Sequence, residues 1–297
     1  MVDTFLKYIQ YERRYSPKTV ISYKTDLRQF EAFLKKEFES TTEDANYGMI
    51  RGWIVSLSEQ QLDATSINRK IACLRSYYKF LRRRDIITKD PLLKVKVLKV
   101  KKKLPHFVNE QDLIQNLDNP EVFEKDGRTE AEQLRDQLVL EMLYGTGMRL
   151  SELIGLKDQD INLRENTVKV LGKRNKERVI PFAPGIVSLL ERYRDVRNRE
   201  VERKDPEYFF VTREGRKLYP VLVHRIVKRG LNKTSVEKKS PHVLRHTYAT
   251  HLLNKGAEIN AVKDLLGHTS LAATQVYTHN TMEKLKEAYK YHPKSGD

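Results

Sequence analysis

Apolar residues recur at alternating steps of three and four from residue 1 to about residue 85, the spacing that lines one face of an α-helix. The clearest rows are Val20, Tyr23, Leu27, Phe30 and Leu34, then Tyr47, Ile50, Ile54 and Leu57, then Ile67, Ile71, Leu74, Tyr78 and Leu81. Ser16 and Pro17 suit a helix start, because the hydroxyl caps free N–H groups and proline fits the first turn. Residues 1–90 are therefore predicted to form a bundle of four helices.

The segment that follows, residues 91–107, is rich in valine and lysine and contains two prolines. Alternation of valine with lysine also fits an edge strand of a sheet. The prolines and the run of like charge favour an extended basic linker instead. We therefore expect a domain boundary near residue 105.

Residues 108–297 are predicted to form a second domain that is mainly helical. A strong helical pattern runs from about residue 130 to residue 144, and we expect it to end at Gly145. The β-branched strings TVKVLG and RVIPF within 160–182 predict a strand, a turn and a second strand. The expected fold class is mainly α with two domains, of which the second is mixed α/β with a small antiparallel sheet.

The charge balance changes the picture from a generic helical protein to one with an acidic partner. The chain of 297 residues has 56 Lys and Arg against 40 Asp and Glu, a formal net charge of +16. Fourteen basic and two acidic residues lie between Arg69 and Lys103. A solvated surface is the ordinary explanation of such a run, but this excess is typical of nucleic-acid binding.

The fourth predicted helix is the candidate for reading DNA, because a helix fits the major groove. The face that we expect opposite its apolar row carries Ser66, Arg69, Lys70 and Cys73. Arg69 and Lys70 are therefore predicted to face the groove. Arg82, Arg83 and Arg84 at the end of the helix suit DNA phosphates.

Several classes of protein are disfavoured by what the sequence lacks. No apolar run approaches the ~18 residues of a membrane span, and the first residues do not resemble a signal peptide, so we expect a cytoplasmic protein. Cys73 is the only cysteine, which leaves no intramolecular disulfide and no thiolate cluster for zinc. We expect Cys73 to be a small packing residue.

Five separate segments each carry a side chain suited to binding phosphate or transferring a proton. They are GTGMRLSEL with Arg149, VLGKRNKERVIPF with Lys173, SPHVLRH with His242 and Arg245, LLGH with His268, and VYTH with Tyr277. Each segment alone has a common structural explanation, such as a helix cap, a solvated lysine or a surface tyrosine. Their joint order and spacing are much more specific.

That order resembles the tyrosine recombinase (phage integrase) family, and within it the Xer group of site-specific recombinases. The first domain likewise resembles the family's N-terminal core-binding, SAM-like bundle. The resemblance implies that Arg149 and Arg245 grip phosphate, that Lys173 is a general acid and that Tyr277 is the nucleophile. It also implies that His242 and His268 assist and that Glu152 is a supporting acid. Arg174 stands where the family string has glycine, so the type of turn beside Lys173 is left open.

The resemblance implies a definite reaction. A tyrosine attacks DNA to form a 3′-phosphotyrosyl intermediate, and strands are exchanged through a Holliday junction without cofactor or metal. The partners implied are double-stranded DNA with paired half-sites and a homo- or hetero-tetramer with a recombinase paralogue. Chromosome dimer resolution is the expected role. A tail helix at about 281–291 is expected to dock on its own domain or on a neighbouring subunit.

Other readings of the sequence stay open. The same chemistry serves an integrase or excisionase of a mobile element, and a type IB topoisomerase. Charge alone would also fit a non-catalytic basic DNA-binding protein. A metallohydrolase is disfavoured, because the histidines follow no HExxH spacing. The histidines considered for such a metal site are His242, His246, His251, His268 and His279.

Overall fold

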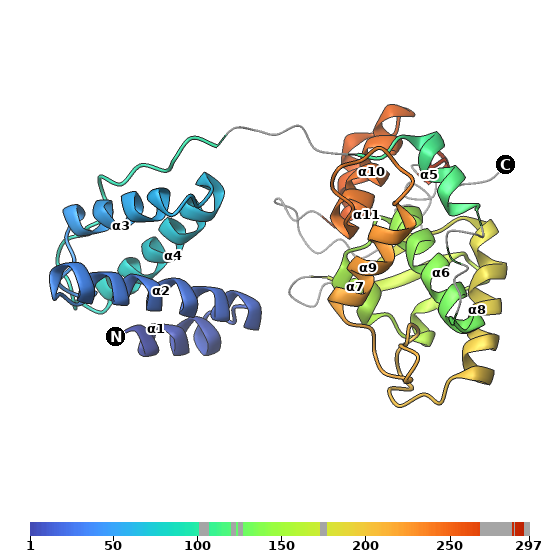
Figure 1. Ribbon diagram of the computed structural model, residues 1–297, viewed down its shortest axis with the longest axis horizontal. Helices are drawn as coiled ribbons and strands as arrows, with labels where there is room; N and C mark the ends of the chain where they lie inside the picture. The colour runs from blue at the N-terminus through green and yellow to red at the C-terminus, as the bar shows by residue number, and fades with distance from the viewer. Residues whose placement is uncertain are drawn as a thin grey trace. The chain divides into compact units, whose positions relative to one another are not determined.

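A computed structural model describes most of the chain, which divides into two compact units (Figure 1). The described residues are 1–100, 107–119, 123, 127–172, 177–267, 287 and 289–293. The N-terminal unit is Met1–Lys103 and the C-terminal unit is Leu104–Asp297. Each unit has its own hydrophobic core.

The N-terminal unit is the predicted bundle of four helices. These are α1 (Val2–Lys7), which continues into a π-helical turn (Tyr8–Glu12), α2 (Pro17–Phe38), α3 (Tyr47–Glu59) and α4 (Ala64–Arg83). The side chains of Ser16, Asn46 and Asp63 cap the last three helices by accepting backbone N–H groups. The prediction of a helical bundle with a proline-initiated second helix is therefore confirmed.

Cys73 lies in the middle of α4 with none of its surface exposed. Burial, and then the nearby charge of Asp26, raise the pKa of its thiol. A buried thiol of this kind is unreactive and behaves as a small apolar residue. The expected packing role is confirmed.

The first part of the predicted linker packs onto the N-terminal unit. Leu92 and Val95 are buried in its core. Leu98 exchanges two hydrogen bonds with the Asn68 side chain on α4, with N···O distances of 2.9 and 2.8 Å. The unit therefore extends beyond the expected end at residue 90, because apolar residues between the lysines cover one side of α4.

The C-terminal unit is built around a three-stranded antiparallel sheet with helices before and after it. The helices before the sheet are α5 (Glu110–Leu117), α6 (Glu130–Thr146) and α7 (Leu150–Gly155). The strands are β1 (Ile161–Asn162), β2 (Thr167–Leu171) and β3 (Glu177–Pro181), in the order β1-β2-β3. The helices after the sheet are α8 (Val187–Glu200), α9 (Pro220–Gly230), α10 (Pro241–Asn254) and α11 (Ile259–Leu266). The predicted strand, turn and strand correspond to β2 and β3.

Helix α6 is the central helix of this unit and packs against α8, α9 and α10. It is buried on nearly every side after its first turn. A capping box holds its start, with the Thr129 side chain accepting from the Glu132 N–H and the Glu132 side chain accepting from Thr129. This helix therefore fixes the positions of the segments at its two ends.

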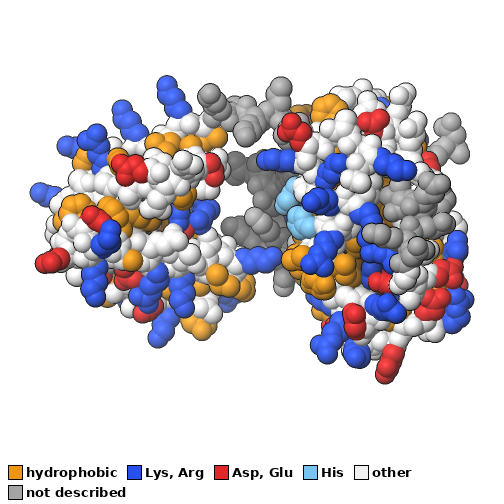
Figure 2. All heavy atoms as spheres, in the orientation of Figure 1, with side chains coloured by type: hydrophobic (Ala, Val, Ile, Leu, Met, Phe, Trp, Pro, Cys, Tyr) orange, Lys and Arg blue, Asp and Glu red, His pale blue; other side chains and the backbone are white. Residues whose placement is uncertain are grey.

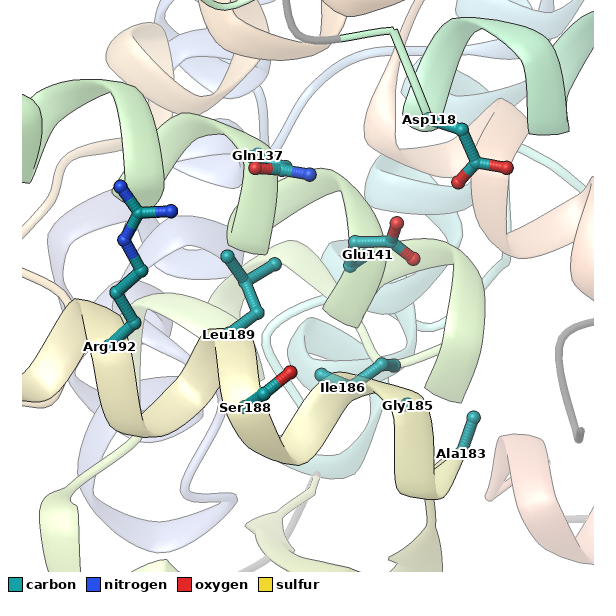
Figure 3. Close-up of a pocket in the computed structure, with 9 residues that line it drawn as sticks. All are labelled: Asp118, Gln137, Glu141, Ala183, Gly185, Ile186, Ser188, Leu189 and Arg192. Carbon is teal, nitrogen blue, oxygen red and sulfur yellow. The ribbon is translucent and has the colours of Figure 1, made fainter.

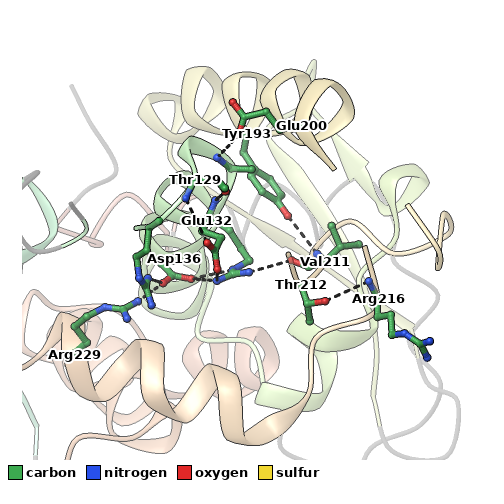
Figure 4. Close-up of polar contacts among 12 residues, drawn as sticks. Thr129, Glu132, Asp136, Tyr193, Glu200, Val211, Thr212, Arg216 and Arg229 are labelled. Atoms are coloured by element: carbon green, nitrogen blue, oxygen red, sulfur yellow. Dashed lines mark hydrogen bonds and ion pairs between the residues drawn. The ribbon is translucent and has the colours of Figure 1, made fainter. Parts of the chain in front are cut away.

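A buried carboxylate attaches the start of α6 to its neighbours (Figure 4). Asp136 has no exposed side-chain surface and pairs with Arg128, with Arg135 at 2.8 Å and with Arg229 on α9. Arg135 also donates a hydrogen bond to the Val211 carbonyl. A single buried charge thus joins α6, α9 and the loop before α9, and leaves no carboxylate uncompensated.

The end of α6 differs from the prediction. The helix continues through Gly145 to Thr146, and Gly147 is the residue beyond its end, with φ of 60°. That left-handed conformation favours glycine, whereas Gly145 is helical and lies where a Cβ would be 3.2 Å from Ile186. Gly145 therefore serves close packing and Gly147 ends the helix.

No helix in the described part of the chain is both long enough and apolar enough to cross a membrane. Within the same residues, no group of three or more His, Cys, Asp or Glu side chains could hold a metal ion.

We predict that Gly147→Ala lowers the free energy of unfolding by about 2–4 kcal/mol, because alanine is strained at positive φ and overpacks a core. Its Cβ would lie 2.5 Å from the buried ring of Tyr248. Urea unfolding of the full chain measures the change. Gly155→Ala is the matched control, since nothing lies within 4 Å of its Cβ. Equal stability of the two variants would contradict the prediction.

Candidate active site

Three arginines from distant parts of the C-terminal unit meet at the C-terminal end of α11. The Leu265 carbonyl accepts from Arg178 Nε at 3.0 Å, and the Leu266 carbonyl accepts from Arg245 Nη2. The Gly267 carbonyl accepts from Arg149 Nη2 at 2.9 Å. The last carbonyls of a helix have no partners within the helix and carry partial negative charge, so arginines bind them well.

Arg149 is the N-cap residue of α7, in the turn that follows Gly147. Glu152, three residues later, accepts the Arg149 backbone N–H at 2.7 Å and its Nη1 at 2.8 Å. The Arg149 side chain keeps 25% of its surface exposed. The guanidinium is thus held at two points and still reaches solvent, as binding an anion requires.

Arg245 lies on the buried side of α10, one turn beyond the cap formed by Ser240 and Pro241. Its Nη1 donates to the Gly147 carbonyl at 2.6 Å. Arg245 therefore ties the turn after α6 to α10. Tyr248, also on α10, packs its fully buried ring against Gly147 and thereby contacts the same turn.

Glu152 is the buried carboxylate of this cluster. Arg178 on β3 donates to both of its oxygens, at 2.7 and 2.8 Å. Burial alone would raise the pKa of Glu152, but the hydrogen bonds and charges of Arg178 and Arg149 outweigh it and hold the pKa at about 2. Glu152 is therefore ionised throughout the physiological pH range.

The cluster carries an excess of positive charge. Three guanidinium groups, from Arg149, Arg178 and Arg245, surround the one carboxylate of Glu152. Burial, and then the charges of Arg149 and Arg178, lower the pKa of Arg245 to about 10. The guanidinium stays protonated at neutral pH, so the described part of the site presents a net positive charge suited to a phosphate.

The histidines of the described residues occupy different environments. His242 lies exposed in the first turn of α10, on the same helix as Arg245. His246 is half-buried, and desolvation lowers its pKa. His251 is buried between the Tyr144 hydroxyl and the Val108 carbonyl, each 3.0 Å away, which gives it a packing role.

Three predicted site residues lie outside the described residues: Lys173, His268 and Tyr277. Their sequence neighbours are described in two cases. The segment with Lys173 connects β2 to β3, and His268 follows Gly267 directly. The segment with Lys173 thus leads into β3, which carries Arg178. His268 follows the end of α11, where the Leu265 carbonyl accepts from Arg178.

The tail is described at only six positions. Of the apolar stripe predicted for it, Tyr289 is described, and it is 5% exposed in the core of its own unit. The ring of His292 stacks on that of Tyr289 and lies 4.6 Å from the centroid of Tyr144. In this structure the end of the tail therefore packs in cis.

The N-terminal unit corrects one expected DNA contact. Lys70 has a side chain only 6% exposed, with its ammonium 2.9 Å from Asp26 on α2. It faces the bundle rather than a groove, because α4 is the central helix and buries about half of its circumference. Arg69 is half-exposed and also pairs with Asp26, at 2.5 Å.

Instead, a set of exposed basic residues lies on α4. We call it the α4 basic row, and its members are Arg69, Arg75, Lys79, Arg82 and Arg83. Arg75 and Lys79 were missed at the sequence level, although Lys79 lies four residues after Arg75 and three before Arg82, a spacing that was a usable signal. Lysines and arginines are visible on the surface of this unit in Figure 2. Arg84 lies over the Phe80 ring, 3.7 Å from Glu12.

A cavity of about 600 Å³ lies between α6 and the start of α8 (Figure 3). Its lining includes Gln137 and Glu141 on α6 and Ser188 and Arg192 on α8. None of the three clustered arginines lines it. The candidate site is therefore the arginine cluster and not this cavity.

Comparison with known proteins agrees with this geometry. The model of the phage integrase family matches residues 107–284, and that of the phage integrase N-terminal SAM-like domain matches residues 2–85. The chain therefore belongs to the phage integrase family. It is a tyrosine recombinase of the Xer type, an enzyme that transfers DNA strands in site-specific recombination.

Its relatives are similar over nearly their whole length. Tyrosine recombinase XerC of Oceanobacillus iheyensis is 40% identical over 304 residues, which cover 99% of this chain and 96% of the relative. XerC of Chlorobaculum parvum is 39% identical over 98% of this chain and 94% of the relative. XerD of Staphylococcus haemolyticus is 33% identical over 99% of each chain.

Solved structures share the fold. The XerH site-specific recombinase bound to a palindromic difH substrate, in a post-cleavage complex, superposes with a TM-score of 0.72 at 24% identity. That match covers 97% of this chain and 84% of XerH. A lambda integrase tetramer bound to a Holliday junction gives a TM-score of 0.67 at 17% identity, over 99% of this chain and 77% of the integrase.

We predict that Glu152→Gln costs about 3–5 kcal/mol of stability at pH 7, the usual effect of breaking a buried ion pair. The folded pKa of about 2 lies below the ordinary 4.5, so the carboxylate stabilises the fold above about pH 4.5. That stabilisation is lost as the pH falls towards 2, and the variant should approach the wild type there. Urea unfolding between pH 7 and pH 3 measures both effects.

The control is the exposed Glu165→Gln, which should follow the wild type at every pH. A stability difference between Glu152→Gln and wild type that stays constant over this range would show that Glu152 does not titrate with a lowered pKa.

Proposed function

We propose that this protein resolves chromosome dimers by cleaving and rejoining DNA at a specific site through Tyr277. The observation that carries the proposal is the meeting of Arg149 and Arg245 at the end of α11, one residue before His268. The XerC and XerD names of the relatives support the cellular role. Integration or excision of a mobile element is the alternative that uses the same site.

In the proposed reaction, Arg149 and Arg245 hold the two non-bridging oxygens of the scissile phosphate. The Tyr277 hydroxyl forms a new bond to phosphorus, and the bond from phosphorus to the 5′-oxygen breaks. Lys173 donates a proton to that departing oxygen. His242 assists removal of the Tyr277 proton, and His268 donates a hydrogen bond to the phosphate.

The excess charge of the arginine cluster supports this assignment. A phosphodiester gains negative charge on its oxygens as the tyrosine attacks, and preorganised donors stabilise that charge without reorganising. The bonds described for Arg245 use its Nη1 and Nη2 towards Gly147 and Leu266. A guanidinium has five N–H donors, so donors of Arg245 and Arg149 remain for a phosphate. Rejoining reverses the step and needs no metal or nucleotide cofactor.

The N-terminal unit supplies the second part of the proposed DNA interface. The α4 basic row presents guanidinium and ammonium groups on the exposed surface of one helix. We propose that Arg69, Lys79, Arg82 and Arg83 from this row contact DNA, with Arg84 beside them. Lys70 is left out because it is buried.

Recombination of two duplexes requires four cleavages, so we propose a tetramer on two paired sites. The relatives include proteins named XerC and others named XerD, which favours a partnership with a recombinase paralogue. In such a hetero-tetramer this chain would cleave one strand of each site. A homo-tetramer would cleave both strands.

The first prediction of this proposal concerns the nucleophile. Purified protein, incubated with sheared host DNA, should form a covalent adduct that survives denaturing electrophoresis. Tyr277→Phe should bind DNA normally and form no adduct, because only the attacking oxygen is removed. Sequencing the attached DNA identifies the site.

A single chromosomal locus outside any mobile element supports dimer resolution, whereas attachment at the ends of an element favours the alternative. Wild type without any adduct would contradict the enzymatic assignment and leave a DNA-binding protein. An adduct that persists in Tyr277→Phe would mean that another tyrosine attacks.

The second prediction concerns the α4 basic row. Lys79→Ala combined with Arg82→Ala should weaken DNA binding and reduce the slope of log K against log salt by roughly 0.9 for each phosphate that the protein no longer neutralises. Equilibrium binding to a duplex with the mapped site, at several salt concentrations and in the Tyr277→Phe background, measures both. Lys35→Ala with Arg51→Ala removes the same charge from exposed positions on α2 and α3. An equal weakening in this control would refute a specific role for the row.

A further inference from the structure

A third arginine binds the same end of α11 as the two that we assign to phosphate. Arg178 is the second residue of β3, opposite Val170 on β2 and on the same inward face as Ile180. An arginine at an inward position of a strand is unusual, because burying a charge is costly unless it is paired. Its side chain is only 5% exposed.

Arg178 is fully engaged with two other segments of the site. It forms a bidentate pair with Glu152 on α7, with distances of 2.7 and 2.8 Å. Its Nε donates to the Leu265 carbonyl at the end of α11, at 3.0 Å. These three bonds join β3, α7 and α11 through one planar group.

The bonds of Arg178 continue to both phosphate-binding candidates. Glu152 accepts from the Arg149 backbone and guanidinium. The segment of α11 that Arg178 holds supplies the Gly267 carbonyl to Arg149 and the Leu266 carbonyl to Arg245. Arg178 therefore shares the partner Glu152 with Arg149, and it binds the carbonyl of Leu265, next to the Leu266 carbonyl that Arg245 binds.

The Arg178 side chain is buried beneath the backbone of Gly267. A Cβ on Gly267 would lie 3.2 Å from both Cδ and Nη1 of Arg178, so the Gly267 backbone packs against the guanidinium. Gly267 also has φ of 61°. Glycine at this position thus allows the helix to end and allows Arg178 to lie beneath it.

We infer that Arg178 is a positioning residue for strand cleavage, which holds Arg149 and Arg245 in place relative to the hairpin that carries Lys173. The inference rests on the proposed function. Lys173 is five residues before Arg178, between β2 and β3, so displacement of β3 moves the proposed general acid as well. Lysine cannot replace the residue, because an ammonium has no planar fork to span both Glu152 oxygens and a carbonyl.

The test compares single-turnover cleavage of the mapped DNA site by Arg178→Lys and wild type at saturating protein. Under these conditions the rate constant reports only on folded molecules. We expect a loss of about 10²-fold in the rate, the usual effect of a small misplacement of catalytic groups. DNA affinity in the Tyr277→Phe background should stay within about threefold of wild type. Arg178→Gln, which keeps a neutral donor, is the second variant.

Arg197→Lys is the matched control for the loss of a buried arginine. Arg197 on α8 is 1% exposed and pairs with Asp158 and the Phe209 carbonyl, away from the cluster. Its replacement should lower stability and leave the cleavage rate constant near that of wild type. An equal slowing by Arg197→Lys would assign the Arg178 effect to general loss of stability and overturn the inference.

A double-mutant cycle separates positioning from an independent role. If Arg178 acts through Glu152, the double variant of Arg178→Lys with Glu152→Gln should be slowed about as much as one single variant. The inference would be overturned if the rate losses of the two single variants multiplied in the double variant. A normal cleavage rate in Arg178→Lys and Arg178→Gln would overturn it as well. In both cases, cleavage by the wild type would still uphold the proposed function. Absence of the wild-type adduct would remove the proposed function, and the inference with it.

Discussion

The C-terminal end of α11 is the point on which the arrangement of the site depends. The carbonyls of Leu265, Leu266 and Gly267 have no partners within the helix, and an unpaired buried carbonyl is costly. Arginines from β3, α10 and the turn before α7 satisfy them. One local requirement of a helix end thus gathers three segments that are far apart in the sequence, and it does so immediately before His268.

The same contacts leave the site with more positive than negative charge. Glu152 offsets one of three guanidinium groups, and its lowered pKa keeps it charged in that role. Arg245 is buried beside two like charges, which lowers its pKa to about 10 without discharging it. A fold that keeps surplus positive charge in a buried place gives up stability, and in the proposed function a bound phosphate would restore the balance of charge. Such a trade is common at functional sites.

The N-terminal unit illustrates how far helical periodicity alone can be trusted. The apolar row through Ile67 and Leu81 correctly predicted α4. It did not predict that the adjacent strip, with Lys70 and Cys73, is buried as well, because that depends on α2 packing beside it. The exposed strip is therefore narrower than expected, and it carries Arg75 and Lys79 in place of Lys70.

The sequence by itself determined the two-part helical architecture, the small sheet and the family, since these follow from periodicity and from short ordered strings. It could not determine which motif residues touch, because contacts such as Arg149 to Gly267 span 118 positions. Arg178 was invisible for the same reason: a single arginine in a strand acquires meaning only when Glu152 and the end of α11 are brought to it. Tertiary packing alone decided that, by placing three unpaired carbonyls and one carboxylate within reach of its guanidinium.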